Sequence, residues 1–307
     1  MRAARITELG APPELAEVEG DGAIEVLAVA LNPLDLAVGS GRFYGGHPDL
    51  PYVPGAEAVG RLADGRRVYM FGAGYGVRRD GFLVERTDFP PDAAADVPDG
   101  LDDALAAATG VVGIAAWVPV AWKAPVRPDD RVLVLGATGM VGLVAVQAAR
   151  LLGAERVVAA GRNEQELERA LQHGADATVR LEGEGLVERM RGACGGDGPT
   201  LVVDPLWGEP ARAAVDAAAH GARIVNLGQS AGPEATLTSA AVRGKQLAIL
   251  GHANVAMDPA ERKRAYAEIA EHVAAGRIRI EVETFPLDQV AAAWSAQAAG
   301  RKAVVVL

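Results

Sequence analysis

Between positions 130 and 250 the chain alternates short, continuously apolar runs with longer amphipathic stretches. Continuous apolar strands are typical of a parallel sheet that is covered on both faces. Their alternation with helical stretches predicts a doubly wound α/β domain. The predicted strands are Val132–Leu135, Arg156–Ala160, Ala177–Arg180, Leu201–Asp204, Arg223–Leu227 and Leu247–Leu250, and the predicted helices are Val141–Leu152, Glu164–His173, Leu186–Arg191 and Pro210–Ala219.

The first 110 residues have a different pattern, in which short apolar runs are separated by Gly and Pro turn signals. This pattern predicts a small β-rich domain, followed by an Ala-rich helix over Asp102–Ala116. Near the C-terminus, Asp258 and the Pro after it predict a helix start, and Gly276 an end. A strand, a helix after Asp288 and a last strand Ala303–Leu307 follow and could return to the first domain. The N-terminal strand predictions are Ala23–Leu31, Val53–Leu62, Arg67–Phe71 and Phe82–Glu85.

Composition narrows the possible functions. The 307 residues suffice for two domains, and Lys plus Arg (30) against Asp plus Glu (40) gives a net charge of −10. Such an acidic chain without a basic cluster argues against nucleic acid or an anionic membrane as a partner. The single cysteine, Cys194, excludes an internal disulfide and a Cys-rich metal cluster. Without a long apolar run or signal peptide, a cytoplasmic protein is expected.

A glycine turn joins the strand at Val132–Leu135 to the helix that follows it. In such a turn, Gly139 would let the backbone approach a pyrophosphate, and Gly142 would let the helix pack against the strand. Amides at the helix start would then stabilise the phosphate charge. A tight turn without a ligand is the alternative interpretation. The predicted dinucleotide-binding residues of this turn are Ala137, Thr138, Gly139, Met140, Val141 and Gly142.

The end of the second strand bears on the choice between NAD and NADP. Dinucleotide sites specific for NAD usually have an acidic residue there, which binds the ribose 2′-hydroxyl. This chain has Gly161 and Arg162 instead. A guanidinium can pair with a 2′-phosphate, which a carboxylate would repel. NADPH is therefore the expected cofactor, unless Arg162 is simply a solvated loop residue.

Several motifs together resemble one enzyme superfamily. Asn32-Pro33-Leu34-Asp35, the segment Leu50–Gly60, the glycine turn, Gly228-Gln229 and Gly300–Val304 occur in the order found in medium-chain dehydrogenases/reductases. The chain is most similar to the zinc-independent quinone oxidoreductase (zeta-crystallin-like) branch. The resemblance implies a GroES-like β-rich domain over 1–112, a Rossmann domain over 113–276 and a C-terminal return over 277–307. It also adds Thr109, Asp204, Gly228 and Gln229 to the expected cofactor-binding residues.

The resemblance also suggests the chemistry. Zinc-dependent relatives carry Cys at the position of Asn32 and His at that of Ala56, and neither residue present here is a zinc ligand. The branch reduces quinones or the C=C bond of enones and enals with NADPH. Asn32, Tyr44 and Tyr52 are the candidate catalytic groups, because each could donate a hydrogen bond to a developing oxyanion. For each of them, a turn-forming or packing role is the alternative.

Other functional hypotheses remain open at this point. A zinc-dependent alcohol dehydrogenase, a non-catalytic NADPH-binding protein and a pathway-specific tailoring reductase are the alternatives to a general quinone or enone reductase. The ligand is expected to be a small molecule. The apolar segment Leu247–His252 would form an edge of the Rossmann sheet, and it predicts a homodimer through that edge.

Overall fold

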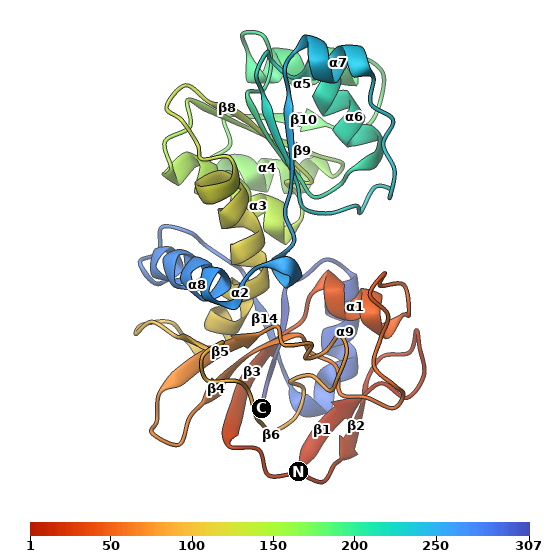
Figure 1. The fold of residues 1–307 in the computed structure, drawn as a ribbon, viewed down its shortest axis with the longest axis vertical. Helices are drawn as coiled ribbons and strands as arrows, with labels where there is room; N and C mark the ends of the chain where they lie inside the picture. Colours follow the sequence, from red (N-terminus) through yellow and green to blue (C-terminus); the bar gives the residue numbers. More distant parts are fainter. The chain divides into compact units, whose positions relative to one another are not determined.

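The computed structural model describes residues 1–307 and divides the chain into two compact units. The first unit combines Met1–Ile114 with Met257–Leu307, and the second is Ala115–Ala256 (Figure 1). A β-rich unit and a parallel α/β unit correspond to the GroES-like and Rossmann domains expected from the sequence.

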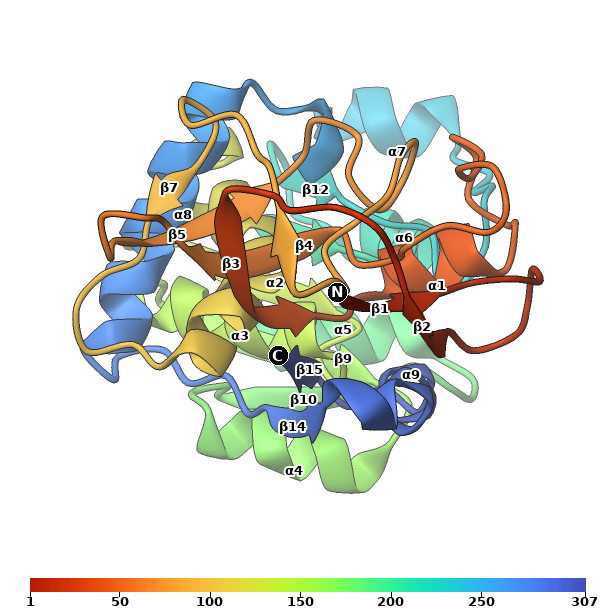
Figure 2. The ribbon, with the colours of Figure 1, turned by 90° about the horizontal axis from the view of Figure 1, so that it is seen from below.

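The first unit is built on a mixed sheet in the order β14-β15-β3-β4-β5-β7, with β6 paired to β3, and it has a separate β1-β2 ribbon. The last strand of the chain, β15, pairs antiparallel with β3, so the C-terminal segment completes the N-terminal sheet (Figure 2). The strands are β1 Arg2–Arg5, β2 Glu14–Glu17, β3 Ile24–Ala30, β4 Glu57–Arg61, β5 Arg67–Phe71, β6 Arg86–Thr87, β7 Ala95–Asp96, β14 Glu283–Pro286 and β15 Ala303–Val306. The helices are α1 Pro33–Gly39, α8 Pro259–Ala274 and α9 Val290–Ala298, with the 3₁₀ turn Leu287–Gln289 and the first part of α2, Asp103–Val118.

Helix α8 belongs to the β-rich unit, whereas the family resemblance predicts a Rossmann domain that extends to residue 276. Its Tyr266 stacks on Tyr69 of β5, with ring centroids 4.1 Å apart, and donates a hydrogen bond to the carbonyl oxygen of Ala106. These buried contacts anchor the helix to the N-terminal sheet. The predicted cap is confirmed, since the Asp258 side chain accepts a hydrogen bond from the amide of Ala260.

Two local predictions differ from the structure. The Asn32-Pro33 pair, a turn signal in the sequence, begins helix α1, with Asn32 at the N-cap and Asp35 accepting a hydrogen bond from its amide. The predicted strand Phe82–Glu85 is not a regular strand. Its backbone bonds to Pro54 and Gly55 as well as to Ala4, so it does not follow one neighbour as a ladder.

The second unit contains a six-stranded parallel sheet in the order β10-β9-β8-β11-β12-β13. Successive residues of β8, such as Val132 and Leu133, are both fully buried, which requires that both faces of the sheet be covered. The strands are β8 Arg131–Leu135, β9 Arg156–Gly161, β10 Ala177–Arg180, β11 Leu201–Asp204, β12 Arg223–Asn226 and β13 Ala248–Gly251. The helices are α3 Met140–Leu151, α4 Glu164–Gln172, α5 Leu186–Cys194, α6 Gly208–Ala217 and α7 Ser239–Gly244, with the 3₁₀ turn Asn254–Ala256.

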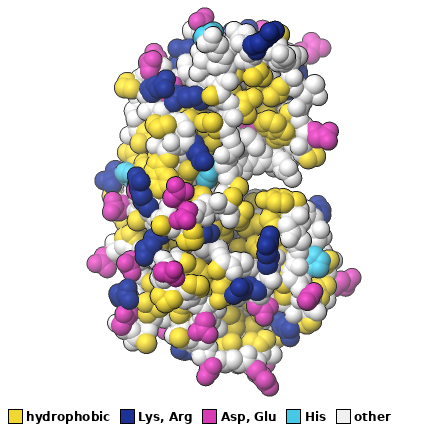
Figure 3. Space-filling model, in the orientation of Figure 1, with side chains coloured by type: hydrophobic (Ala, Val, Ile, Leu, Met, Phe, Trp, Pro, Cys, Tyr) yellow, Lys and Arg dark blue, Asp and Glu magenta, His cyan; other side chains and the backbone are white.

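The helical stretch Asp103–Lys123 comprises α2 and a π-helical turn, Pro119–Lys123. Contrary to the expectation from the sequence, it is long and apolar enough to cross a membrane, but 78% of its most apolar window is buried inside the protein. A buried core helix has the same composition. On the face drawn in Figure 3, acidic and basic side chains are interspersed, without a large patch of one sign.

Candidate functional site

The glycine turn has the backbone geometry that a dinucleotide-binding loop requires. Gly136 has a φ of +61°, and Gly139 is the N-cap of α3 with extended φ and ψ. A Cβ on Gly142 would lie 2.3 Å from the carbonyl oxygen of Gly136, so only glycine lets α3 start this close to β8. The two helix glycines of the motif therefore have different roles, because Gly142 is needed for packing whereas Gly139 is accessible at the helix start.

The start of α3 offers hydrogen-bond donors. The amide of Gly139 donates to Gly136, but the amides of Thr138, Met140 and Val141 have no acceptor within the chain. Free amides and the positive end of the helix dipole together suit an anionic group. The residues present therefore fit the diphosphate of a dinucleotide, with Gly139 leaving room for its approach.

The end of β9 is shaped by packing as well as by charge. A Cβ on Gly161 would lie 2.4 Å from Cγ2 of Thr138, so a larger side chain there requires the Thr138 side chain to shift. Arg162 is exposed, with no hydrogen-bond or ion-pair partner. Arg180 of β10 lies opposite Gly161 in the parallel register, but Glu164 and Glu182 already pair with it. Arg162 is the unpaired cation at this strand end.

The remaining cofactor candidates of the second unit, Asp204, Gly228 and Gln229, lie at strand ends and differ in how exposed they are. Asp204 is fully buried, and its carboxylate accepts hydrogen bonds from the amides of Leu206 and Trp207 and from Nδ2 of Asn226. Burial raises the pKa of Asp204. These contacts give Asp204 a role in shaping the loop after β11. Gly228 and Gln229 follow β12; Gly228 is partly exposed and Gln229 is exposed.

In the first unit, Asn32 is part of a buried polar network. It is 1% exposed. Its Nδ2 donates to Oε1 of Glu57 at 2.7 Å and to the carbonyl oxygen of Ala30 at 3.2 Å. Its Oδ1 accepts a hydrogen bond from Nζ of Lys302 at 2.8 Å. Both hydrogens of the Asn32 amide are thus already donated within the chain.

Glu57 is the centre of this network. Besides Asn32, its Oε1 lies 3.2 Å from Nζ of Lys302, and the glutamate is completely buried. Its Oε2 accepts hydrogen bonds from the Tyr69 hydroxyl at 2.8 Å and from the Val111 amide at 2.6 Å. Burial, and then the nearby Glu57 charge, raise the pKa of Tyr69 well above its usual value. The carboxylate is saturated with donors, as a buried charge must be.

The residues at the two expected zinc-ligand positions, Asn32 and Ala56, do not fit zinc. The position expected for a cysteine ligand holds an amide, and the position expected for a histidine holds the methyl group of Ala56. Thr109, which the resemblance assigns to cofactor binding, is fully buried, and its hydroxyl donates a hydrogen bond to the carbonyl oxygen of Leu105. The amide oxygen of Asn32 and the carboxylate of Glu57 are both already bonded to the ammonium of Lys302. No group of three or more His, Cys, Asp and Glu side chains is close enough to hold a metal ion.

Asp35 supports the same region beside the network. Its carboxylate accepts hydrogen bonds from the amides of Asn32 and Ala56, each at 2.8 Å. Burial raises the pKa of Asp35 to about 6 despite these bonds, and the charge of Glu57 contributes in the same direction. Asp35 thereby connects the start of α1 to the loop before β4.

The two candidate tyrosines have opposite environments. Tyr44 is 81% exposed, and its ring is tilted against that of Phe43, with its hydroxyl unbonded. Tyr52 is 1% exposed, and its hydroxyl has no hydrogen-bond partner. Burial and the neighbouring Asp35 raise the pKa of Tyr52. Only Tyr44 presents a donor that a ligand could reach without rearrangement.

Sequence reasoning did not select Glu57, Tyr69 or Lys302 as site residues, although Glu57 and Lys302 lie within the quoted motifs. The sequence does contain a signal for Glu57 and Lys302, because each is a charged residue beside the apolar residues of a predicted strand. Buried Glu and Lys are rare unless they are paired. The pairing itself joins residues 245 positions apart and is not visible in any local pattern.

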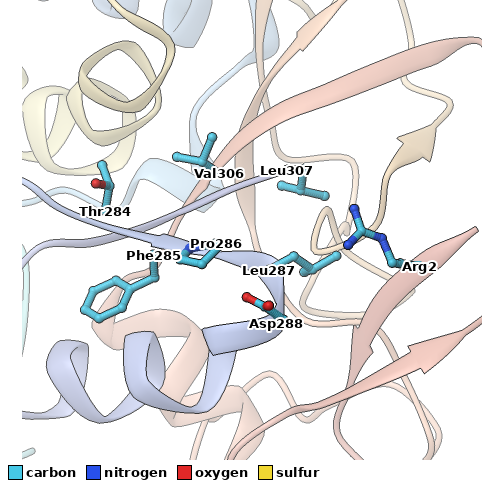
Figure 4. Close-up of a pocket in the computed structure, with 8 residues that line it drawn as sticks. All are labelled: Arg2, Thr284, Phe285, Pro286, Leu287, Asp288, Val306 and Leu307. Atoms are coloured by element: carbon cyan, nitrogen blue, oxygen red, sulfur yellow. The ribbon is translucent and has the colours of Figure 1, made fainter.

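A cavity of about 520 Å³ opens at the other end of β15 from Lys302 (Figure 4). Of its two charged lining residues, Arg2 and Asp288, Arg2 is already paired with Glu85. The lining residues are Arg2, Thr284, Phe285, Pro286, Leu287, Asp288, Val306 and Leu307. This cavity shares no residue with the buried network.

Comparisons with known proteins agree with this architecture. Residues 140–272 match the family described as zinc-binding dehydrogenase. The quinone oxidoreductase of Salmonella typhimurium is 30% identical over 227 residues, which are 72% of this chain and 68% of that protein. A phenolphthiocerol/phthiocerol polyketide synthase polypeptide of Mycobacterium tuberculosis is 28% identical over 295 residues. That match covers 91% of this chain, which spans only 13% of the synthase polypeptide.

Solved structures support the same assignment. An NAD-dependent alcohol dehydrogenase has a TM-score of 0.88 at 29% identity, and the quinone oxidoreductase of Thermus thermophilus has 0.80 at 30% identity. Each match covers 100% of both chains. Together with the sheet order and the glycine loop, these matches show that the chain belongs to the medium-chain dehydrogenase/reductase superfamily, among its quinone oxidoreductase-like members.

Proposed function

We propose that the protein is a zinc-independent, NADPH-dependent reductase of quinones or α,β-unsaturated carbonyl compounds. The observation that carries this proposal is that Asn32 and Ala56 occupy the positions where a zinc-dependent relative needs a cysteine and a histidine ligand, and that both amide hydrogens of Asn32 are already donated within the chain. Without a metal to stabilise an alkoxide, alcohol oxidation is disfavoured, whereas hydride addition to an electron-poor acceptor is not. The 30% identity to a quinone oxidoreductase supports the same reaction class.

The Rossmann residues would hold the cofactor in the following way. The amides at the start of α3 would bind the diphosphate, and exposed Arg162 would pair with the 2′-phosphate. When bound, NADPH supplies the hydride. Gly161 supports the preference, since glycine provides no carboxylate at the position where an NAD site has an acidic side chain. The related Thermus thermophilus enzyme has been solved in complex with NADPH.

Turnover tests this proposal. NADPH oxidation should be observed with a panel of quinones and enones, in protein whose zinc content is substoichiometric by metal analysis. We expect NADPH to be preferred over NADH, and Arg162→Glu to reduce this preference by roughly tenfold or more, as loss of a charged hydrogen bond implies. Arg180→Glu is not a suitable control because Arg180 is in two ion pairs, so Arg243→Glu serves instead.

Each outcome of this assay bears on one alternative. NADPH binding without turnover on any acceptor would favour the non-catalytic alternative. Activity that rises in proportion to added zinc would favour an alcohol dehydrogenase. Failure with general acceptors but turnover of a thioester-linked enoyl substrate would favour a pathway-specific tailoring reductase, for which the match to part of a polyketide synthase is suggestive. Preference for NADH would overturn the cofactor assignment.

We also propose a homodimer formed through β13 in the cytoplasm. Strand β13 is at the edge of the six-stranded sheet, and its Ile249 is 37% exposed. An unpaired apolar edge of this kind favours pairing with a second copy. Light scattering at micromolar concentration should report a dimer, and Ile249→Lys should report a monomer, whereas a monomeric wild-type protein would contradict the proposal.

A further inference from the structure

Arg262, in the first turns of α8, is a buried cation without a counter-ion. It is 8% exposed, and its guanidinium forms no hydrogen bond and no ion pair. Its one specific side-chain contact is with the ring of Phe71, whose centroid lies 5.2 Å from Cζ of Arg262. Arginine does not lose its proton in proteins, so this charge is permanent.

An unpaired buried charge is costly, and chains rarely retain one without a use. A cation–π contact with Phe leaves the N–H donors of the guanidinium unsatisfied. Burial lowers the pKa of Arg262, which expresses the same lack of stabilising partners, although Tyr69 and Asp258 act in the opposite direction. Asp258 itself caps the helix through Ala260, without forming an ion pair with Arg262.

The guanidinium nitrogens are nevertheless accessible. The fully enclosed polar side-chain atoms that lack a partner are Nε of Arg5 and the Tyr52 hydroxyl, so the unpaired nitrogens of Arg262 retain contact with solvent. Gly72 lies directly beside the guanidinium, because a Cβ there would be 2.2 Å from Nη1. Glycine at this position, with a φ of +103°, lets the guanidinium lie against the backbone.

Arg262 is also close to the candidate active-site network of the same unit. Phe71 is the register partner of Glu57 across β4 and β5. Tyr69, two residues before Phe71, bonds to Glu57 and stacks on Tyr266, one helical turn after Arg262. The contacts through Phe71, Tyr69 and Tyr266 therefore link Arg262 to the Asn32–Glu57–Lys302 network.

We propose that Arg262 is an oxyanion-binding residue and that the substrate of this enzyme carries a carboxylate, which pairs with it. This inference rests on the proposed reductase function and specifies its substrate class as an acidic enone or enoate. A planar guanidinium binds a carboxylate through two parallel hydrogen bonds, and a partly desolvated site strengthens them.

A matched pair of acceptors tests the proposal. 4-Oxopent-2-enoate and its methyl ester differ in the negative charge and share the enone. The wild-type protein should reduce the acid with the higher kcat/KM, and Arg262→Met should lower that value by roughly tenfold to a hundredfold while leaving the ester within about twofold. Arg262→Lys, which keeps the charge but cannot make two parallel hydrogen bonds to a carboxylate, should have an intermediate effect. Lys263→Met, an exposed neighbour on the same helix, is the control and should change neither.

An equal fall in kcat/KM for the acid and the ester in Arg262→Met, or no fall for either, would overturn the proposal. Weaker NADPH binding in Arg262→Met, with both acceptors affected alike, would also overturn it. If neither acceptor is reduced, the proposed reductase function fails on these acceptors, and a second readout still decides the role of Arg262. Sodium acetate, titrated at constant ionic strength, should raise the Tm of the wild-type protein more than that of Arg262→Met. Identical acetate dependence in the two proteins would overturn the anion site.

Discussion

The ammonium group of Lys302 lies 3.0 Å from the carbonyl oxygen of Leu31, in addition to its contacts with Asn32 and Glu57. This places a fixed cation and a fixed anion in the core of the β-rich unit, both fully enclosed. Such a pair contributes little net stability compared with apolar residues, but removing one member leaves the other charge unpaired. The network therefore holds Asn32 in one orientation.

Lys302→Met should destabilise the protein by about 3–5 kcal/mol, because Glu57 is left buried without its cation. Urea unfolding followed by circular dichroism measures this change. Arg301→Met is the matched control, since Arg301 forms an exposed pair with Glu283 that is worth at most about 1 kcal/mol. Similar destabilisation by both variants would contradict the role given to Lys302.

Tyr44 is the candidate whose hydroxyl a substrate can reach. If it protonates the enolate formed by hydride addition, Tyr44→Phe should lower kcat for enone reduction by about a hundredfold. Quinone reduction should fall less, because a hydroquinone anion takes a proton from water. Tyr75→Phe is the control, since the Tyr75 hydroxyl is bonded to the carbonyl oxygen of Asp88. Unchanged enone turnover in Tyr44→Phe would leave water as the proton donor.

Asp35 should make the stability of the protein depend on pH. Its pKa is about 6 in the folded protein and 3.8 in the unfolded chain, so the folded state holds the proton more tightly. The stability from this group is full below pH 3.8 and is lost as the pH rises through about 6, by about 3 kcal/mol in total. The difference in unfolding free energy between the wild-type protein and Asp35→Asn should therefore fall from pH 4 to pH 7. A flat difference would show that Asp35 titrates normally.

At the scale of elements, the two glycines at the start of α3 separate folding from binding. Gly142→Ala should destabilise the protein by about 1–3 kcal/mol, since the new Cβ meets backbone atoms that cannot move easily. Gly139→Ala should leave Tm close to that of the wild-type protein, because its Cβ would lie 3.4 Å from the nearest atom. It should still weaken NADPH binding, measured by fluorescence titration, because in the proposed site the methyl group would face the diphosphate. Equal NADPH affinity in Gly139→Ala and the wild-type protein would contradict this position for the cofactor.

The parallel strands were predicted within one or two residues because each is a continuous apolar run between turn signals. Helix α1 was missed because seven residues with Pro at the start carry no helical periodicity, and its capping by Asp35 depends on tertiary burial. The glycine loop could be predicted from spacing alone. The Glu57–Lys302 pair could not, because strand β15 reaches β3 only when the sheet is complete.

At the scale of the whole molecule, the boundary near residue 257 changes which residues can build a site. Assigning α8 to the β-rich unit brings Arg262 and Tyr266 beside Phe71 and Tyr69, whereas the resemblance places them with the cofactor-binding domain. The β-rich unit therefore contains both the Asn32–Glu57–Lys302 network and the unpaired cation, and the α/β unit contains the glycine loop that fits a diphosphate.

The most direct test of the central claim is deuteride transfer to an enone from NADPH that is deuterated at both C4 positions, by protein whose zinc content is substoichiometric. NMR of the product should show one deuterium on the carbon β to the carbonyl, formed at a rate independent of added zinc or chelator. Product without deuterium, or transfer that appears only when zinc is supplied, would contradict a zinc-independent hydride transfer.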